Sequence, residues 1–446
     1  MHIILKANLC FILISSFFLS FCLATEKVEA NPVRSISQSA YIALESHPKI
    51  LISRNDIYSS QQQLTKVESA LLPSVSLSLG IGREDSNNSS TKVKAGFSSL
   101  DMERRESAIT LSQMIFDGFN ADNLRRSQLE KITAEEADYF NLASEVALKA
   151  IETHLDVATK NKILNDHLAN LKVHEQIAKD IGLRVRSGKD NRARVSQISA
   201  RLSLALANLE TAKTQVLSAN VDYLRDVGEM PSRQLNSLGQ LFKMPETESG
   251  FLEVVIRDNP FLDSKTKEIN AQKFVEKASQ SSRLPNVYFE SGASWNDNLD
   301  GVSGRNSDAF IMLRMRYNLY KGGSDRAEER LAKYQAQSLR YELDDLRREF
   351  KREASRAWFS YQSNAKRVSF LQDYVESAQT TKIAYAQQFN IGQRSLIDLL
   401  DAENELLKAK GQLHEAQQAL SLSKYQILHL QGKLLSTLSL DSLVVM

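Results

Sequence analysis

An apolar residue, mostly leucine, recurs every seventh position near the C-terminus, and this repeat constrains the fold more than any other feature. One register holds Leu399, Leu406, Leu413, Leu420, Ile427 and Leu434, and a second register, three residues further on, holds Ala402, Ala409, Ala416, Ser423 and Leu430. An ordinary amphipathic core helix has a period of about 3.6 residues and would drift off this seam within a few turns. The repeat therefore predicts a coiled-coil helix that a partner helix approaches closely.

A turn precedes this helix. Gly392 is the residue type that takes a left-handed backbone at a helix end, and Ser395 with Asp398 three residues later is a capping-box pattern. We therefore predict a helical hairpin, with a long helix over residues 324–388 and the heptad helix over 395–435.

The same plan occurs 204 residues earlier, where Ser187-Gly188 corresponds to Ile391-Gly392. Its seam holds Val195, Leu202, Leu209, Val216 and Tyr223, with Ile198, Ala205, Ala212 and Ala219 in the small register. The chain is therefore an internal duplication. We predict a first repeat over 32–229, with a long helix over 120–185 and a heptad helix over 190–228, a connector over 230–250, a second repeat over 251–435 and a tail over 436–446.

The N-terminus has the features of a secretory signal peptide, predicted over residues 1–24. Its mostly apolar run from Leu9 to Leu23 is too short to cross about 30 Å of hydrocarbon. Cleavage after Ala24 or after Ala30 would remove both cysteines of the chain. Lipid attachment at Cys22 is an alternative, although Phe21 is bulky for a lipoprotein cleavage site.

The remaining composition excludes several classes of function. The 56 basic and 54 acidic residues give a net charge of +2, which does not favour nucleic-acid binding. The histidines show no metal-binding spacing, and no nucleophile or phosphate-loop motif is present. We therefore predict neither an enzyme nor a cofactor or metal site.

Four segments alternate with a period of two and are predicted strands: 74–82, 107–116, 286–295 and 308–320. The polar residues 83–106, between the first two predicted strands, are predicted to form an exposed loop. In the last strand Ile311 and Leu313 share one face, while Arg314 and Arg316 share the other; Glu290 lies on the polar face of the preceding strand. This pattern is typical of an outer-membrane barrel, with Glu290, Arg314 and Arg316 facing the lumen. A soluble sheet with one solvent-exposed face is the alternative, because it gives the same alternation.

Four strands cannot close a barrel, and helices of about 100 Å cannot bury their apolar seams alone. The chain must therefore oligomerise. A trimer would supply twelve strands and a helical tube.

The duplicated layout, the tips Arg186-Ser-Gly188 and Asn390-Ile-Gly392, and the stretch from Gly392 to Leu406 together resemble the TolC family of outer-membrane channel-tunnel proteins. The likeness covers about Val33 to Leu435. The sequence of the second tip is more similar to that of the type I secretion branch of this family than to that of the multidrug branch.

This resemblance implies a mixed α and β membrane protein: a trimeric twelve-stranded outer-membrane β-barrel, four strands per chain, continuous with a long periplasmic α-helical coiled-coil barrel. It would be a homotrimeric conduit through outer-membrane lipid, with no chemistry of its own. Tips around Gly188 and Gly392 would dock a periplasmic adaptor and, through it, an inner-membrane ABC transporter that exports a protein substrate. Drug or metal efflux is the alternative within this architecture, and a periplasmic coiled-coil scaffold is the alternative outside it.

The resemblance also implies gate residues. Asp398 and Asp401 match paired aspartates that form an acidic ring at the periplasmic entrance, although a helix cap explains Asp398 equally well. Arg394 matches an arginine that helps to hold the tips closed. Its expected acidic partner is replaced by Arg194, so we predict that Arg194 pairs instead with Asp398 or Asp401.

Overall fold

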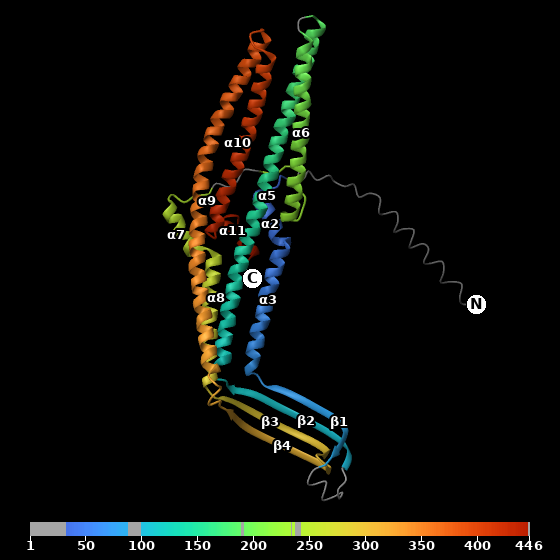
Figure 1. The fold of residues 1–446 in the computed structure, drawn as a ribbon, viewed down its shortest axis with the longest axis vertical. Helices are drawn as coiled ribbons and strands as arrows, with labels where there is room; N and C mark the ends of the chain where they lie inside the picture. Colours follow the sequence, from blue (N-terminus) through green and yellow to red (C-terminus); the bar gives the residue numbers. More distant parts are fainter. Residues whose placement is uncertain (1–32, 88–99, 189–190, 233, 237–241, 445–446) are drawn as a thin grey trace, which may run out of the picture.

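The computed structural model describes residues 33–87, 100–188, 191–232, 234–236 and 242–444 of the 446-residue chain. The predicted signal peptide lies outside these residues. Long helices run side by side, with two hairpin turns at one end of the molecule and a four-stranded sheet at the other (Figure 1). No helix in the described ranges is both long and apolar enough to cross a bilayer.

The two halves of the chain repeat the same elements, which confirms the predicted duplication. The first half consists of α2 (Ile36–Ser46), α3 (Pro48–Glu68), η1 (Ser69–Leu71), β1 (Ser74–Ser86), β2 (Leu100–Phe116), α5 (Asn120–Arg186) and α6 (Arg192–Val227). The second half consists of α7 (Glu248–Asp258), α8 (Pro260–Ser279), η2 (Gln280–Arg283), β3 (Asn286–Leu299), β4 (Val302–Arg316), α9 (Ser324–Asn390) and α10 (Leu396–Leu430), followed by α11 (Leu434–Thr437) and η3 (Asp441–Leu443). Helices α5 and α9 have 67 residues each, so the repeats match in length as well as in order.

Proline sets the break between the first two helices of each half. His47 and Asn259 both have extended backbones and precede Pro48 and Pro260, because a residue before proline is disfavoured in the helical region. Each then caps the next helix: the His47 side chain accepts the Lys49 N–H at 3.2 Å, and Asn259 does the same for its own helix.

The sheet is antiparallel in the order β1-β2-β3-β4. Its register pairs Val75 with Leu111 and Leu77 with Ile109, so the apolar side chains of neighbouring strands share one face. That face is exposed in the single chain: Leu77 is 69% and Ile311 is 75% exposed. The predicted alternation is therefore present.

The strand ends differ from the prediction. Strand β1 continues to Ser86 and β2 begins at Leu100, so much of the predicted loop 83–106 is strand; the rest, residues 88–99, lies outside the described residues. Opposite charges stabilise this extension, since Arg83 pairs with Asp101 at 2.9 Å. Strand β4 runs from Val302 to Arg316, whereas the predicted strand covered residues 308–320. Arg316 pairs with Asn286, the first residue of β3, so residues 317–320 have no β3 residue to pair with.

Helix α10 ends at Leu430, five residues before the predicted end of the heptad helix at 435. Gly432 has φ of +69°, and a β-carbon there would lie 2.8 Å from the Asp258 carbonyl oxygen and 3.0 Å from Pro260. The chain turns at this close approach, and Leu434 and Leu435 continue in α11, where they are buried.

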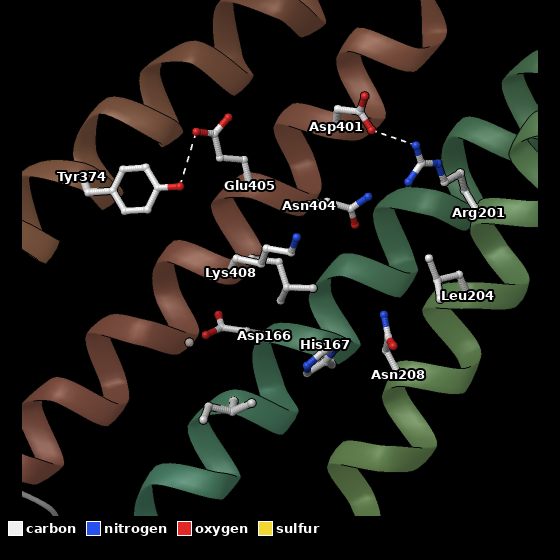
Figure 2. Close-up of a pocket in the computed structure, with 13 residues that line it drawn as sticks. Asp166, His167, Arg201, Leu204, Asn208, Tyr374, Asp401, Asn404, Glu405 and Lys408 are labelled. Atoms are coloured by element: carbon white, nitrogen blue, oxygen red, sulfur yellow. Dashed lines mark hydrogen bonds and ion pairs between the residues drawn. The ribbon is translucent and has the colours of Figure 1, made fainter.

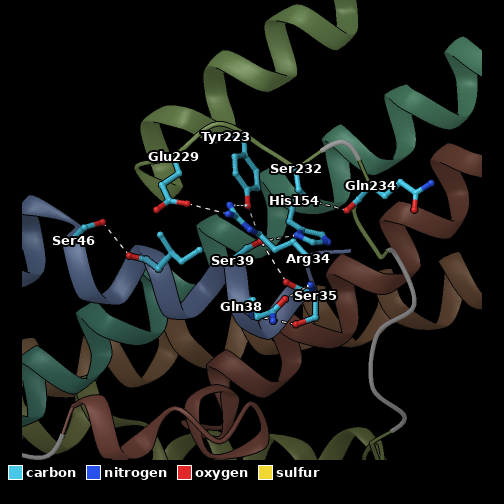
Figure 3. A network of polar contacts seen from close by, with 11 residues as sticks. Arg34, Ser35, Gln38, Ser39, Ser46, His154, Tyr223, Glu229, Ser232 and Gln234 are labelled. Carbon is cyan, nitrogen blue, oxygen red and sulfur yellow. Dashed lines mark hydrogen bonds and ion pairs between the residues drawn. The ribbon is translucent and has the colours of Figure 1, made fainter. Parts of the chain in front are cut away.

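Helices α2, α3, α5, α6, α10 and α11 meet near the middle of the molecule and enclose the largest apolar cluster of the described residues, called the mid-molecule cluster below. A buried polar network lies beside this cluster (Figure 3): His154 Nδ1 and Tyr223 OH each lie 2.8 Å from Ser39 Oγ. Arg34 donates to Tyr223 at 3.2 Å and pairs with Glu229 at 2.9 Å. Burial lowers the pKa of His154, so its imidazole stays neutral and can share these hydrogen bonds.

Candidate functional site

The hairpin ends opposite the sheet hold the predicted site residues. Helices α5 and α6 turn at the first tip (residues 186–188), and α9 and α10 turn at the second tip (residues 390–392) (Figure 1). Gly188 and Gly392 have φ of +71° and +79°, and an added β-carbon would meet nothing within 4 Å at either position. Backbone conformation, rather than crowding, therefore requires glycine at both tips.

The two hairpins pack together just behind their tips. The buried cluster there, called the tip cluster below, consists of Ile181, Ile198, Phe389, Leu396, Leu399 and Leu400. The Arg184 guanidinium on α5 lies 5.2 Å from the ring centre of Phe389 on α9, which adds a cation–π contact between the hairpins. Two of these residues, Ile198 and Leu399, lie on the predicted seams within a hairpin, but the seams do not predict that they join the two hairpins.

Asp398 and Arg394 make their contacts within the second hairpin. Ser395 Oγ accepts the Asp398 N–H at 3.2 Å, and Asp398 Oδ2 accepts the Ser395 N–H at 3.3 Å, which completes a capping box. Arg394 donates to Gln388 at 2.9 Å, stacks 4.1 Å from the Tyr385 ring centre and lies 3.9 Å from Asp398. The alternative explanation of Asp398 as a helix cap therefore describes its contacts in the single chain.

Asp401 pairs with Arg201 of α6 at 2.8 Å, which links the two hairpins (Figure 2). This contact differs from the predicted pairing of Arg194 with an aspartate. Arg194 lies in the first turn of α6, where its backbone N–H is capped by Asn191. Because Asp401 is almost a full turn deeper than Asp398, its partner must also lie deeper, and Arg201 is one heptad beyond Arg194 on the same helix face.

A groove of about 740 Å³ separates the hairpins behind the Asp401–Arg201 pair. Figure 2 shows its polar side chains, which come from four helices: Asp166 and His167 of α5, Arg201 and Asn208 of α6, Tyr374 of α9, and Asp401, Asn404, Glu405 and Lys408 of α10. Near the groove Asp166 accepts from His414 at 3.0 Å and from Lys410 at 3.5 Å. Burial acts to raise the pKa of Asp166, but these two contacts outweigh it and hold the pKa below its usual range.

The polar face of the sheet holds the other predicted residues. Glu290 of β3 and Arg314 of β4 pair at 2.9 Å. Arg316 shares this face at the last residue pair of the sheet, opposite Asn286. Among the described residues, no group of three or more histidine, cysteine, aspartate or glutamate side chains is arranged to hold a metal ion.

Comparison with known proteins gives the family. Residues 40–224 and 256–433 each match the outer membrane efflux protein family. The chain belongs to this family. The two matched segments lie one in each half of the duplication.

Two relatives and a solved structure illustrate how far this outer membrane efflux protein has diverged. The outer membrane efflux protein BepC of Brucella suis is 25% identical over 73% of this chain and 72% of its own length. The alkaline protease secretion protein AprF of Pseudomonas aeruginosa is 22% identical over 84% of this chain and 80% of its own length. The Campylobacter jejuni CmeC outer membrane channel superposes with a TM-score of 0.76 at 15% identity, covering 90% of this chain and 86% of that one.

Family membership fixes the location and general role of the chain. It is an outer-membrane channel protein whose helices extend into the periplasm, and it is not an enzyme. This location excludes a periplasmic scaffold that never enters the membrane.

Proposed function

We propose that three copies of this chain form the passive exit conduit of a type I secretion system. The likeness to AprF, which is named for the secretion of a protease and aligns with 84% of this chain, supports this assignment most directly. In this role the channel conducts an exported protein from an inner-membrane ABC transporter and a periplasmic adaptor, and the transporter supplies the energy.

Unburied apolar surface supports the trimer. Helix α6 exposes Leu217, Val221 and Leu224, which are neighbours at helical spacing, and Leu206 about three turns away; Phe370 of α9 is exposed as well. Strands β1 and β4 are the two edges of the sheet, with hydrogen-bonding groups that need a partner strand. Pairing of β1 with β4 of the next copy would join three sheets into one twelve-stranded barrel and bring the α6 and α9 surfaces together.

The tips are the proposed periplasmic gate. Gly188 and Gly392 place compact turns at the end of the molecule, where an adaptor would dock. Three copies of Asp398 and Asp401 would form an acidic ring that attracts cations. Arg201 and Arg394 offset this charge partly, because each already contacts one of the aspartates.

Planar-bilayer recordings of the purified mature protein test the conduit and the ring together. We expect a cation-selective channel that divalent cations block from the periplasmic side, and we expect the block to weaken in Asp398→Asn/Asp401→Asn. Glu405→Gln, a nearby carboxylate change in the groove, is the matched control. Equal block in the wild type and the double variant would remove the ring assignment.

Efflux of drugs or metals is the second candidate, and the naming of BepC as an efflux protein favours it. A deletion strain separates the two roles. We expect loss of one or a few proteins from the culture supernatant, restored by the wild-type gene, with unchanged drug and metal susceptibility. Hypersensitivity with a normal set of secreted proteins would assign the conduit to efflux instead.

A further inference from the structure

The polar face of strand β4 carries apolar side chains at two neighbouring positions of that face. Phe310 and Met312 lie on the face that also carries Arg314 and Arg316, opposite to the apolar face of Ile311. Both side chains are 40% exposed, so they are partly covered by the sheet but still accessible from its polar side. Their position on this face is not explained by contact with lipid.

The Phe310 ring is held flat against the sheet. Phe310 is the register partner of Gly292 in β3, and a β-carbon on Gly292 would lie 2.9 Å from Cε1 and 3.0 Å from Cζ of the ring. The same β-carbon would lie 3.1 Å from the Ile109 carbonyl oxygen. The ring therefore occupies the space that any larger residue at position 292 would fill.

Polar groups flank this apolar pair along β4. Asp308, opposite Ser294, lies on one side, and Arg314, which pairs with Glu290 at 2.9 Å, lies on the other. Met114 of β2 lies on the same face, opposite Tyr288 and therefore in the row of residue pairs that contains Arg314. Met114, Phe310 and Met312 are called the lumen belt below.

The charged pair nearest to Met312 is matched. Glu290 is paired with Arg314, and towards the far end of the strands Arg104 contacts both Glu84 and Glu106. Glu290 and Arg314 neutralise each other beside Met312, whereas Arg104 offsets only one of its two glutamates at the far end of the strands. Around Met312 the wall therefore attracts a passing molecule mainly by apolar contact.

We propose that the lumen belt binds the apolar side chains of an unfolded polypeptide during its passage and thereby retains it longer than a chain of polar side chains. The proposal rests on the proposed trimeric conduit, in which symmetry places three copies of Phe310 at one height. A folded domain presents a mostly polar surface, whereas an unfolded chain presents its leucine and phenylalanine side chains. Short-lived contacts of this kind retain the chain without trapping it, because each buries little area.

Peptide dwell times in single channels test the belt. Two unfolded peptides of equal length and charge are added on the barrel side, one with leucine at every fourth position and the other with serine there. In the wild type we expect the leucine peptide to block the current about ten times longer. Phe310→Ser/Met312→Ser should remove this difference, whereas Asn306→Ser, on the same face of β4, should retain it.

A second variant tests the geometry without removing the ring. Gly292→Ala should push the Phe310 ring off the sheet and lower the open-channel conductance, and Gly292→Ala/Phe310→Ser should restore it. Equal dwell of the two peptides in conducting wild-type channels, or an unchanged preference in the double serine variant, would overturn the belt and leave the conduit intact. Absence of any current from correctly assembled wild-type protein would refute the conduit itself and the belt with it.

Discussion

Truncation of Phe389 should open the periplasmic end far more than loss of the Asp401–Arg201 ion pair. Phe389 is 6% exposed in the tip cluster, and removing a buried phenylalanine side chain costs about 3–5 kcal/mol. The ion pair is exposed, with 57% of the Asp401 side chain accessible, so its loss costs at most about 1 kcal/mol. The apolar contact should therefore dominate the closed state.

The size of the effect follows from how much of this loss is specific to the closed tip. If about a third of it falls on contacts between the hairpins, each chain loses about 1 kcal/mol, and a trimer loses about 3 kcal/mol. The ratio of open to closed channels should then rise on the order of 100-fold. The contact of Arg184 with the Phe389 ring adds to this figure, since an alanine side chain offers no aromatic face to the guanidinium.

Single-channel open probability at neutral pH measures this ratio for Phe389→Ala, Arg201→Ala and Ile391→Ala. Ile391 is the matched control because it lies at the same tip but is 68% exposed. We expect a large increase for Phe389→Ala, a small one for Arg201→Ala and none for Ile391→Ala. An increase for Arg201→Ala equal to that for Phe389→Ala would refute the argument that apolar packing holds the tips together.

Three further predictions concern stability and assembly. Burial lowers the pKa of His429 from 6.5 to about 4. The contribution of the neutral imidazole to the free energy of unfolding is therefore fully present above about pH 6.5 and falls by about 3 kcal/mol per chain as the pH drops towards 4. His429→Gln should reduce this loss, as measured by melting curves at pH 7.5 and 4.5. Gly392→Ala should cost only about 1 kcal/mol from backbone strain, whereas Gly432→Ala should cost clearly more in the same melting assay because its β-carbon would meet the Asp258 carbonyl oxygen. Leu217→Asp/Val221→Asp should yield monomers in cross-linking and light scattering with helical content retained, and persistent trimers would show that this α6 surface is not the interface.

Local periodicity was sufficient to predict most of the architecture. The seven-residue seam indicated which face of α10 is buried, and Leu399, Leu406 and Ala409 are indeed buried there. Glycine and proline positions located the turns, because Gly392 needs a left-handed backbone and the residue before Pro260 cannot continue a helix. These signals arise from neighbouring residues and can be read without knowing the tertiary structure.

The errors occurred where distant residues decide the outcome. Residues 83–86 and 100–106 look like a loop because they are charged, yet pairing across the hairpin makes them strand. Helix α10 ends early because Gly432 packs against Pro260, which lies more than a hundred positions away in sequence. The partner of Asp401 was missed for the same reason, since the relative height of α6 and α10 depends on how the two hairpins pack.

Contacts between the hairpins change in character along their length, and this bears on how the conduit opens. The mid-molecule cluster and the tip cluster each contain residues of both hairpins. Between these two levels each hairpin also buries a small cluster of its own, Leu171 with Leu209 in the first and Ala378 with Leu406 in the second.

The groove lies between these small clusters, and hydrogen bonds and ion pairs such as Asp166–His414 cross between the hairpins at this level. Water can replace such polar contacts at little cost, so the hairpins can separate along the groove more readily than at the tip. If the tips are the gate, as proposed, the tip cluster is the apolar contact that opening must break, and we expect a partner that opens the channel to cover the surface of Phe389 and its neighbours as they part.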